Sequence, residues 1–178
     1  MTPRRWAKSS AREHLKIIST TSGTGSEVTL WAVITDPKRH IKYNVGGTGL
    51  IAAWVAILDP ELTAGLPPLM TAATGMDALS HAIESIHARY YEPISDGLAC
   101  QAIRLIVTYL PRCLEKGDDL EARGMQAIAS TLAGMALICR RRGDMKLAVP
   151  FGPFLAVGAI AYLFIGAELW SWYIAVVR

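Results

Sequence analysis

Residues 71–84 read TAATGMDALSHAIE, and the apolar positions in and around this stretch recur with a helical period. Asp77 and His81 stand four residues apart, which puts a carboxylate and an imidazole on one face of a helix, one turn apart. A helix offers two ligands to one metal ion in this way. Glu84 follows three residues later on the same face, as either a third ligand or a solvated charge.

The same residues also have a purely structural interpretation. Thr74 and Asp77 match the spacing of a capping box, in which polar side chains satisfy backbone N–H groups at a helix start. Asp77 would then neutralise the helix end, and His81 would be an ordinary half-buried residue. The spacing by itself leaves both interpretations open.

The elements around this stretch change in character along the chain. Residues rich in β-branched and aromatic side chains predict strands at 14–20, 28–36, 40–45 and 54–59, the last of them buried, with a hairpin turn at 36–39. Helical periodicity then covers residues 67–91, 95–110, with a possible extension to Glu115, and 119–137; Ser95 is a plausible N-cap. Strands followed by helices indicate an α+β chain or the junction of two domains.

Composition narrows the class of protein. The 178 residues are 52% hydrophobic and 19% charged, with a formal net charge of +3. Residues 1–136 hold 13 basic and 13 acidic side chains, so the excess lies in residues 137–178. No long basic face interleaved with aromatics accompanies it, which argues against a nucleic-acid partner. The three cysteines form no CxxC pattern, so neither a disulfide scaffold nor a zinc finger is predicted.

The glycine-rich segment TTSGTGSE, residues 20–27, has the composition of a loop that brings backbone N–H groups close to phosphates. It matches neither of the standard glycine-rich phosphate motifs, so a simple turn is the alternative. The remaining histidines, His14, His40 and His87, have no neighbour at the spacing of metal ligands.

The end of the chain is strongly apolar. Residues 147–167 contain no charged side chain, and 21 residues of helix match the thickness of a bilayer core of about 30 Å. Basic residues flank the near end and aromatic residues the far end: Arg140, Arg141, Arg142 and Lys146, then Trp170, Trp172 and Tyr173. This arrangement predicts a membrane helix with residues 1–136 in the cytoplasm. A buried hairpin or core helix is the alternative.

Several stretches, taken together and in order, resemble the iron-containing alcohol dehydrogenases. They are IISTTSGTGSEVT (17–29), AVITDPKRHIK (32–42), VAILDPELTAGLPP (55–68), TAATGMDALSHAIE (71–84) and ISDGLACQAIRLI (94–106). The resemblance extends from about residue 15 to residue 136. It implies the end of an α/β nucleotide-binding domain at 15–66 and part of a helical metal-binding domain at 67–137. Residues 1–14 then form an unassigned basic N-terminus, and residues 138–178 a basic linker with an apolar tail.

The resemblance also implies a chemistry. The family transfers a hydride between an alcohol and an aldehyde or ketone, with NAD(P) and Fe²⁺, or Zn²⁺, as cofactors. Members of the family bind their metal through one aspartate and three histidines. Two of these four ligands fall on Asp77 and His81. The family's cofactor contacts fall on Thr20, Thr21, Thr24, Val33 and Lys42. A small alcohol or aldehyde is the implied substrate, and a homo-oligomer is possible.

The sequence departs from this pattern at important places. No histidine occurs after His87, and the family's Gly-Gly-Gly-Ser loop for the pyrophosphate is absent from these residues. We therefore expect the chain to be incomplete as a dehydrogenase and inactive alone. The alternative is a non-enzymatic, membrane-anchored protein or a degenerate fusion.

The tail has a resemblance of its own. Residues 149–166 and 170–173 are similar to the last membrane helix of prepilin peptidases, and GDMKL (143–147) is similar to part of their Gly-x-Gly-Asp motif. Arg141 replaces the first glycine, and a second catalytic aspartate is lacking. This resemblance implies a membrane helix without proteolysis; a remnant of a prepilin peptidase is a weaker alternative.

Overall fold

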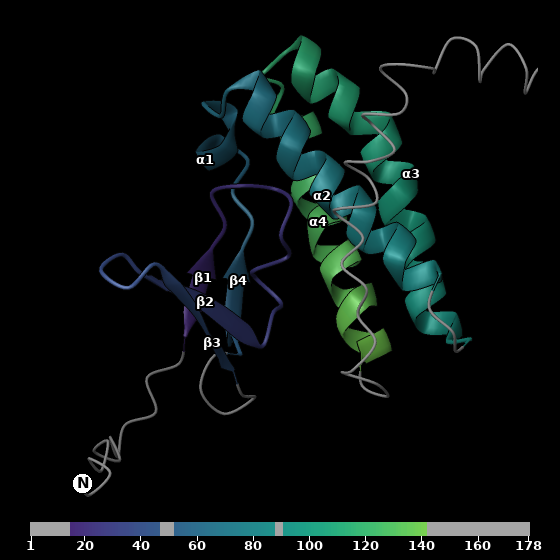
Figure 1. Cartoon of the computed structure of the whole chain (residues 1–178). Helices are drawn as coiled ribbons and strands as arrows, with labels where there is room; N and C mark the ends of the chain where they lie inside the picture. The colour runs from purple at the N-terminus through teal and green to yellow at the C-terminus, as the bar shows by residue number, and fades with distance from the viewer. Residues whose placement is uncertain (1–14, 47–51, 88–90, 142–178) are drawn as a thin grey trace, which may run out of the picture.

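A computed structural model describes residues 15–46, 52–87 and 91–141 (Figure 1). Two small sheets precede three long helices, which confirms the predicted α+β class. Strand β1 (Lys16–Ile18) pairs in parallel with β4 (Val55–Ile57). Strand β2 (Trp31–Asp36) pairs with β3 (Ile41–Gly46) as an antiparallel hairpin.

The hairpin turn forms where the sequence predicts it. The Asp36 carboxylate Oδ1 accepts hydrogen bonds from the backbone N–H of Lys38 at 2.9 Å and of Arg39 at 3.3 Å. Aspartate favours turns because its short side chain can bond to the backbone two or three residues on. His40, with φ of 53°, then leads the chain into β3.

The prediction that residues 54–59 form a buried strand is wrong for the described part of the chain. Side chains Val55 and Ile57 are 47% and 44% exposed, and Trp54 is 71% exposed. Strand β4 contacts β1 and no other described element, so neither face of this two-stranded sheet is covered. An apolar composition identifies a strand but does not supply the layer that would bury it.

Helices α2 (Pro68–Ile86), α3 (Pro93–Glu115) and α4 (Leu120–Arg141) pack pairwise against one another, after the short α1 (Glu61–Ala64). Helices α2 and α4 run in the same direction and α3 runs opposite to them (Figure 1). One end of the bundle has an alanine core that lets the backbones approach closely: Ala82, Ala99, Ala102, Ala133 and Ala136. Larger residues fill the rest, namely Leu105, Ile106 and Leu110 with Ala78 and Ala129.

The capping-box interpretation of Thr74 and Asp77 is wrong, because α2 already begins at Pro68. Proline suits a first helical position, where the backbone N–H has no partner in any case. Thr74 therefore lies within the helix, and its hydroxyl donates to the carbonyl of Met70 at 2.8 Å. Asp77 is thus free of a capping role at the helix start.

The N-cap prediction for Ser95 is also wrong. Helix α3 begins at Pro93, and the side chain of Glu92 accepts hydrogen bonds from the backbone N–H of Ile94 and Ser95. The Ser95 hydroxyl is instead buried; it lies 2.9 Å from Ser85 Oγ and donates to the carbonyl of Ala136 at 2.8 Å. It ties all three helices together. The predicted extension of this helix to Glu115 is confirmed.

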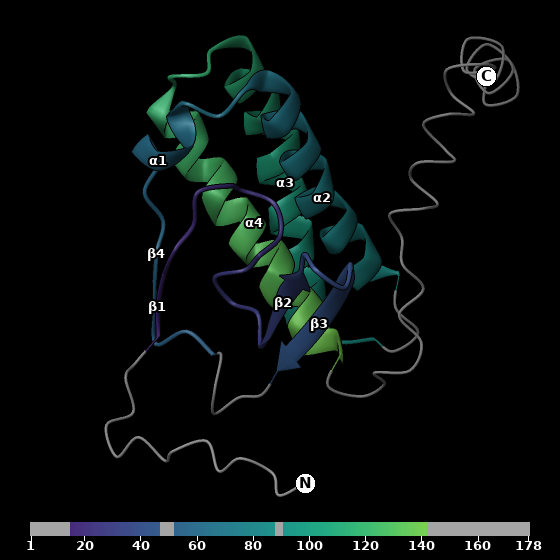
Figure 2. The same ribbon diagram turned by 60° about the vertical axis from the view of Figure 1, so that its left-hand side comes forward.

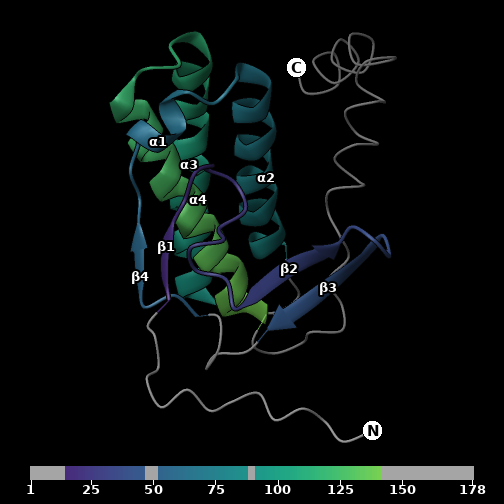
Figure 3. The same ribbon diagram turned by 90° about the vertical axis from the view of Figure 1, so that its left-hand side faces the viewer.

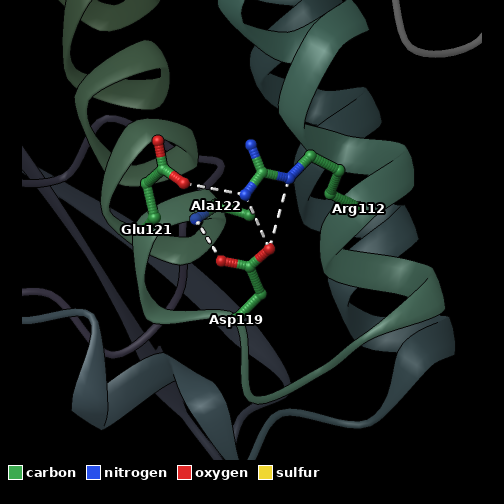
Figure 4. Close-up of polar contacts among 4 residues, drawn as sticks. All are labelled: Arg112, Asp119, Glu121 and Ala122. Atoms are coloured by element: carbon green, nitrogen blue, oxygen red, sulfur yellow. Dashed lines mark hydrogen bonds and ion pairs between the residues drawn. The ribbon is translucent and has the colours of Figure 1, made fainter.

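The start of α4 is held by a small charged cluster (Figure 4). Asp119 accepts from the backbone N–H of Ala122 at 3.0 Å and from Arg112 at 2.8 Å and 3.2 Å. Arg112 also donates to Glu121 at 2.8 Å. The bond from Ala122 and the neighbouring guanidinium hold the pKa of the Asp119 carboxyl below its usual value.

We expect this cluster to make stability depend on acid pH. A carboxyl group whose pKa is lower in the folded than in the unfolded chain contributes stability that is present above the unfolded pKa, near 4. That contribution is lost as pH falls through the folded pKa. Urea unfolding of wild type and Asp119→Asn between pH 2 and pH 7 should show the two midpoints converging at the acid end. A constant difference across this range would contradict the assignment.

Helix α4 is also apolar enough, over Leu120–Cys139, to match a membrane span by length and composition. Half of that window is buried inside the protein, against α2 and α3, as expected of a core helix. The predicted membrane helix at 147–167 lies outside the described residues.

Candidate metal and cofactor site

Helix α2 places Asp77 and His81 side by side, as their spacing predicts. The distance from His81 Nε2 to Asp77 Oδ1 is 3.7 Å, which is too long for a hydrogen bond. The Asp77 side chain is 43% exposed and that of His81 22% exposed. The two side chains therefore lie close together on one face of α2 and are both partly accessible.

These two side chains fit neighbouring positions around one metal ion. Ligand distances of about 2.0–2.2 Å let a single ion bridge atoms up to about 4 Å apart. Binding through Nε2 requires a proton on Nδ1, which ordinarily donates to a partner. The His81 Nδ1 atom is buried and has no hydrogen-bond partner within the described residues. Nor does any group of three or more candidate ligands occur among them, so the site as described is a pair.

The side chains of the glycine-rich loop between β1 and β2 fall into an accessible group and a buried group. Thr20 and Thr24 are exposed and Thr21 is half-buried, whereas Ser22 and Glu27 are buried. The three threonines that the family resemblance assigns to the cofactor are thus on the accessible side of the loop. The buried side of the loop packs against helices α2 and α4.

Two glycines explain how the loop lies so close to the helices (Figure 2). A Cβ atom on Gly23 would stand 2.4 Å from the carbonyl oxygen of Thr74, which is backbone and cannot yield easily. Gly25 has φ of 60°, a conformation that favours glycine, and a Cβ there would stand 2.9 Å from the Cα of Gly134 on α4. The loop therefore touches α2 one turn before Asp77.

The hairpin places Val33 and Lys42 on one face. Thr35 pairs with Lys42 across the strands, and Val33 lies two residues before Thr35, so all three side chains point the same way. Trp31 shares this face, and its ring covers Gly46, where a Cβ would come within 2.1 Å.

Sequence reasoning missed two buried charged residues. Glu27 is 3% exposed and accepts hydrogen bonds from the hydroxyls of Ser19 and Thr131. Arg123 is also 3% exposed and donates to three oxygen atoms: the carbonyls of Gly117 and Leu66 and the hydroxyl of Thr71. A charged position on the apolar side of a predicted helix was the available signal for Arg123.

Cys100, Cys113 and Cys139 are free. Cys113 is buried in α3, and burial raises the pKa of its thiol. A buried thiol of raised pKa is a packing residue, because the thiolate is the reactive form.

Helix α2 thus carries an aspartate and a histidine on one face, one turn beyond the point where the glycine-rich loop touches it. The family Iron-containing alcohol dehydrogenase matches residues 4–60, and Fe-containing alcohol dehydrogenase family, C-terminal, matches residues 71–149. The chain belongs to the iron-containing alcohol dehydrogenases. The matches begin before residue 15 and end after residue 136, so they are wider than the stretch on which the resemblance rests.

Individual relatives agree with this assignment. Choline dehydrogenase of Bacillus subtilis (strain 168) is 52% identical over 122 residues, which are 68% of this chain and 30% of that protein. NAD-dependent methanol dehydrogenase of Bacillus methanolicus is 50% identical over 119 residues, 67% of this chain and 31% of the relative. The chain thus spans about a third of the length of these relatives.

Solved structures show the same fold. The sulfoacetaldehyde reductase of Bifidobacterium kashiwanohense, in complex with NAD+, superposes with a TM-score of 0.64 at 42% identity, over 69% of this chain and 32% of that one. An iron-containing alcohol dehydrogenase of Thermococcus thioreducens gives 0.64 at 38% identity, over 70% and 32%. The resemblance of the tail to prepilin peptidases gains no support from these comparisons.

Proposed function

We propose that this chain supplies part of the catalytic centre of an iron-dependent alcohol dehydrogenase, which transfers a hydride between an alcohol and NAD(P). The observation that carries the proposal is the contact between Gly23 and Thr74. It puts the outward-facing threonines of the loop next to the helix that bears Asp77 and His81. Cofactor and metal are thus served by neighbouring elements.

The roles of the residues follow from this arrangement. Asp77 and His81 would hold Fe²⁺ or Zn²⁺, and such an ion supplies Lewis-acid polarisation of the alcohol or carbonyl oxygen. Thr20, Thr21 and Thr24 would bind the cofactor through their hydroxyl and backbone groups, and Val33 and Lys42 would contact it from the hairpin. These residues would hold and orient the metal and the cofactor, and a bound nicotinamide would supply the hydride chemistry.

The substrate class is also a proposal. Relatives named for propanol, methanol and 1,3-propanediol favour a small alcohol or aldehyde. These 178 residues hold two metal ligands where such sites normally use three or four protein groups, so by themselves they should not turn over. A cytoplasmic location and a homo-oligomer remain predictions. The membrane-anchored alternatives gain no support from the described residues or from the relatives.

Metal titration tests the proposal. Four-ligand zinc sites bind with roughly 10–16 kcal/mol, so two ligands should give roughly half, or dissociation constants between about 1 µM and a few hundred µM. We expect calorimetry of the whole chain to show weak binding of Zn²⁺, Co²⁺ and Mn²⁺ with little selectivity. Asp77→Ala and His81→Ala should each remove it.

Matched variants control for non-specific effects. His87→Ala removes an exposed histidine just past the end of α2, and Asp118→Ala removes an exposed carboxylate; both should leave binding unchanged. Binding that survives Asp77→Ala would contradict the metal site. Tight, stoichiometric iron lost in Asp77→Ala would instead show that the described pair is not the whole site.

A further inference from the structure

A buried carboxylate fastens the glycine-rich loop to α4. One oxygen of Glu27 accepts a hydrogen bond from Ser19 Oγ at 2.9 Å, and the other accepts one from Thr131 Oγ1 at 2.6 Å. Among the described residues, no basic side chain forms an ion pair with Glu27. Burying a carboxylate is costly, and hydrogen bonds to an ionised group are the strong kind that can offset this cost. The position of Glu27 is therefore set by two hydroxyl groups.

The same stretch of loop touches both α2, which bears Asp77 and His81, and α4. Thr131 lies one turn before Gly134, which contacts Gly25, and Gly23 contacts Thr74 on α2. Figure 3 shows the loop crossing α4 between β1 and the hairpin. The bond between Glu27 and Thr131 is a polar contact in a seam that also contains the close approaches at Gly23, Gly25 and Gly134. Loosening this bond should let the loop move away from both helices.

We propose that Glu27 is a positioning residue, which acts through Thr131 to set the place of the loop threonines relative to Asp77 and His81. This inference rests on the proposed function of those residues. Within the described part of the chain, Glu27 forms no hydrogen bond or ion pair with Asp77, His81 or the loop threonines. Its effect passes through the backbone of residues 23–25.

The test compares two threonines in similar settings. Each lies within a helix with its hydroxyl in hydrogen-bond range of the carbonyl four residues earlier: Thr131 Oγ1 is 3.1 Å from Ala127 and Thr108 Oγ1 is 2.8 Å from Arg104. The single hydroxyl proton of Thr131 has the Glu27 carboxylate, at 2.6 Å, as its nearer acceptor. Thr131→Val removes the bond to Glu27 with little change of shape, and Thr108→Val is the matched control. Glu27→Gln, which keeps the shape of the side chain and one acceptor oxygen, should show the same change at smaller size.

Hydrogen exchange of the full chain measures how strongly the hydrogen bond between Glu27 and Thr131 holds the loop against α4. In Thr131→Val, the amide of Val28, which donates to the carbonyl of Gly25 at 3.1 Å, should exchange about tenfold faster, a ratio equivalent to ~1.4 kcal/mol and close to what one bond to a charged group contributes. Amides within α3 should not change, and Thr108→Val should exchange like the wild type throughout. Equal loop exchange in wild type and Thr131→Val would overturn the proposal.

Paramagnetic broadening by Mn²⁺ then tests whether Glu27 sets the distance between the loop and the metal pair or only stabilises the loop. Mn²⁺ held by Asp77 and His81 should broaden the NMR signals of residues 20–25 in the wild type, and Asp77→Ala should abolish this effect. In Thr131→Val the broadening should fall while the Mn²⁺ affinity stays unchanged. Broadening that persists in Thr131→Val would overturn the positioning role alone. Absence of broadening in the wild type would overturn the proposed metal site, and the positioning role with it.

Discussion

Replacing Arg123 by methionine should lower the free energy of unfolding by about 2–4 kcal/mol, because three hydrogen bonds to a buried guanidinium disappear together. The bonds reach Leu66 before α2, Thr71 in its first turns and Gly117 in the turn before α4. Each acceptor would lose a charged donor. The substitution also removes the cost of burying a charged group, which offsets part of this loss. The effect is therefore smaller than the sum of the three bonds.

Urea denaturation of the full chain measures this difference. Arg123→Lys keeps the charge but presents a single ammonium group instead of a planar fork, so we expect an intermediate loss. Arg104→Met is the matched control, because Arg104 is exposed on α3, and it should change stability by less than about 0.5 kcal/mol. A wild-type midpoint in Arg123→Met would show that the three bonds contribute nothing net.

Gly23→Ala should destabilise the chain by about 2–3 kcal/mol, the range of a methyl group forced into a packed contact that must shift. The added Cβ would stand 2.4 Å, 2.7 Å and 2.8 Å from atoms of Thr74, two of them in the backbone of α2. Backbone of a packed helix cannot move aside as a flexible side chain can. The loop should therefore lift away from α2, and the accessibility of residues 20–27 should rise.

Thermal melting measures the loss of stability, and limited proteolysis measures the accessibility of the loop. Gly97→Ala is the control, since a Cβ there meets nothing within 4 Å and alanine favours a helix by about 0.5–1 kcal/mol over glycine. Gly97→Ala should be neutral or slightly stabilising, while Gly23→Ala should melt lower and be cut faster in the loop. If both variants melt like the wild type, the close contact between loop and helix is incorrect.

Residues near each other in the sequence determined much of this protein. A four-residue spacing was sufficient to put Asp77 and His81 on one helical face, because the period of a helix is fixed by its backbone. The register of the hairpin, which its short turn sets, puts Val33 and Lys42 on one face. The Asp36 turn followed from side-chain chemistry within four residues.

Only the tertiary structure decided the contacts between distant residues. Thr131 and Glu27 are 104 positions apart, and Arg123 and Thr71 are 52 apart. Nothing local to Ser95 indicates that its hydroxyl bonds to Ala136 rather than capping α3, because both environments suit a serine. Exposure of β4 could not be predicted from its apolar residues either. Burial depends on which layers lie against a strand, and that is a property of the folded chain.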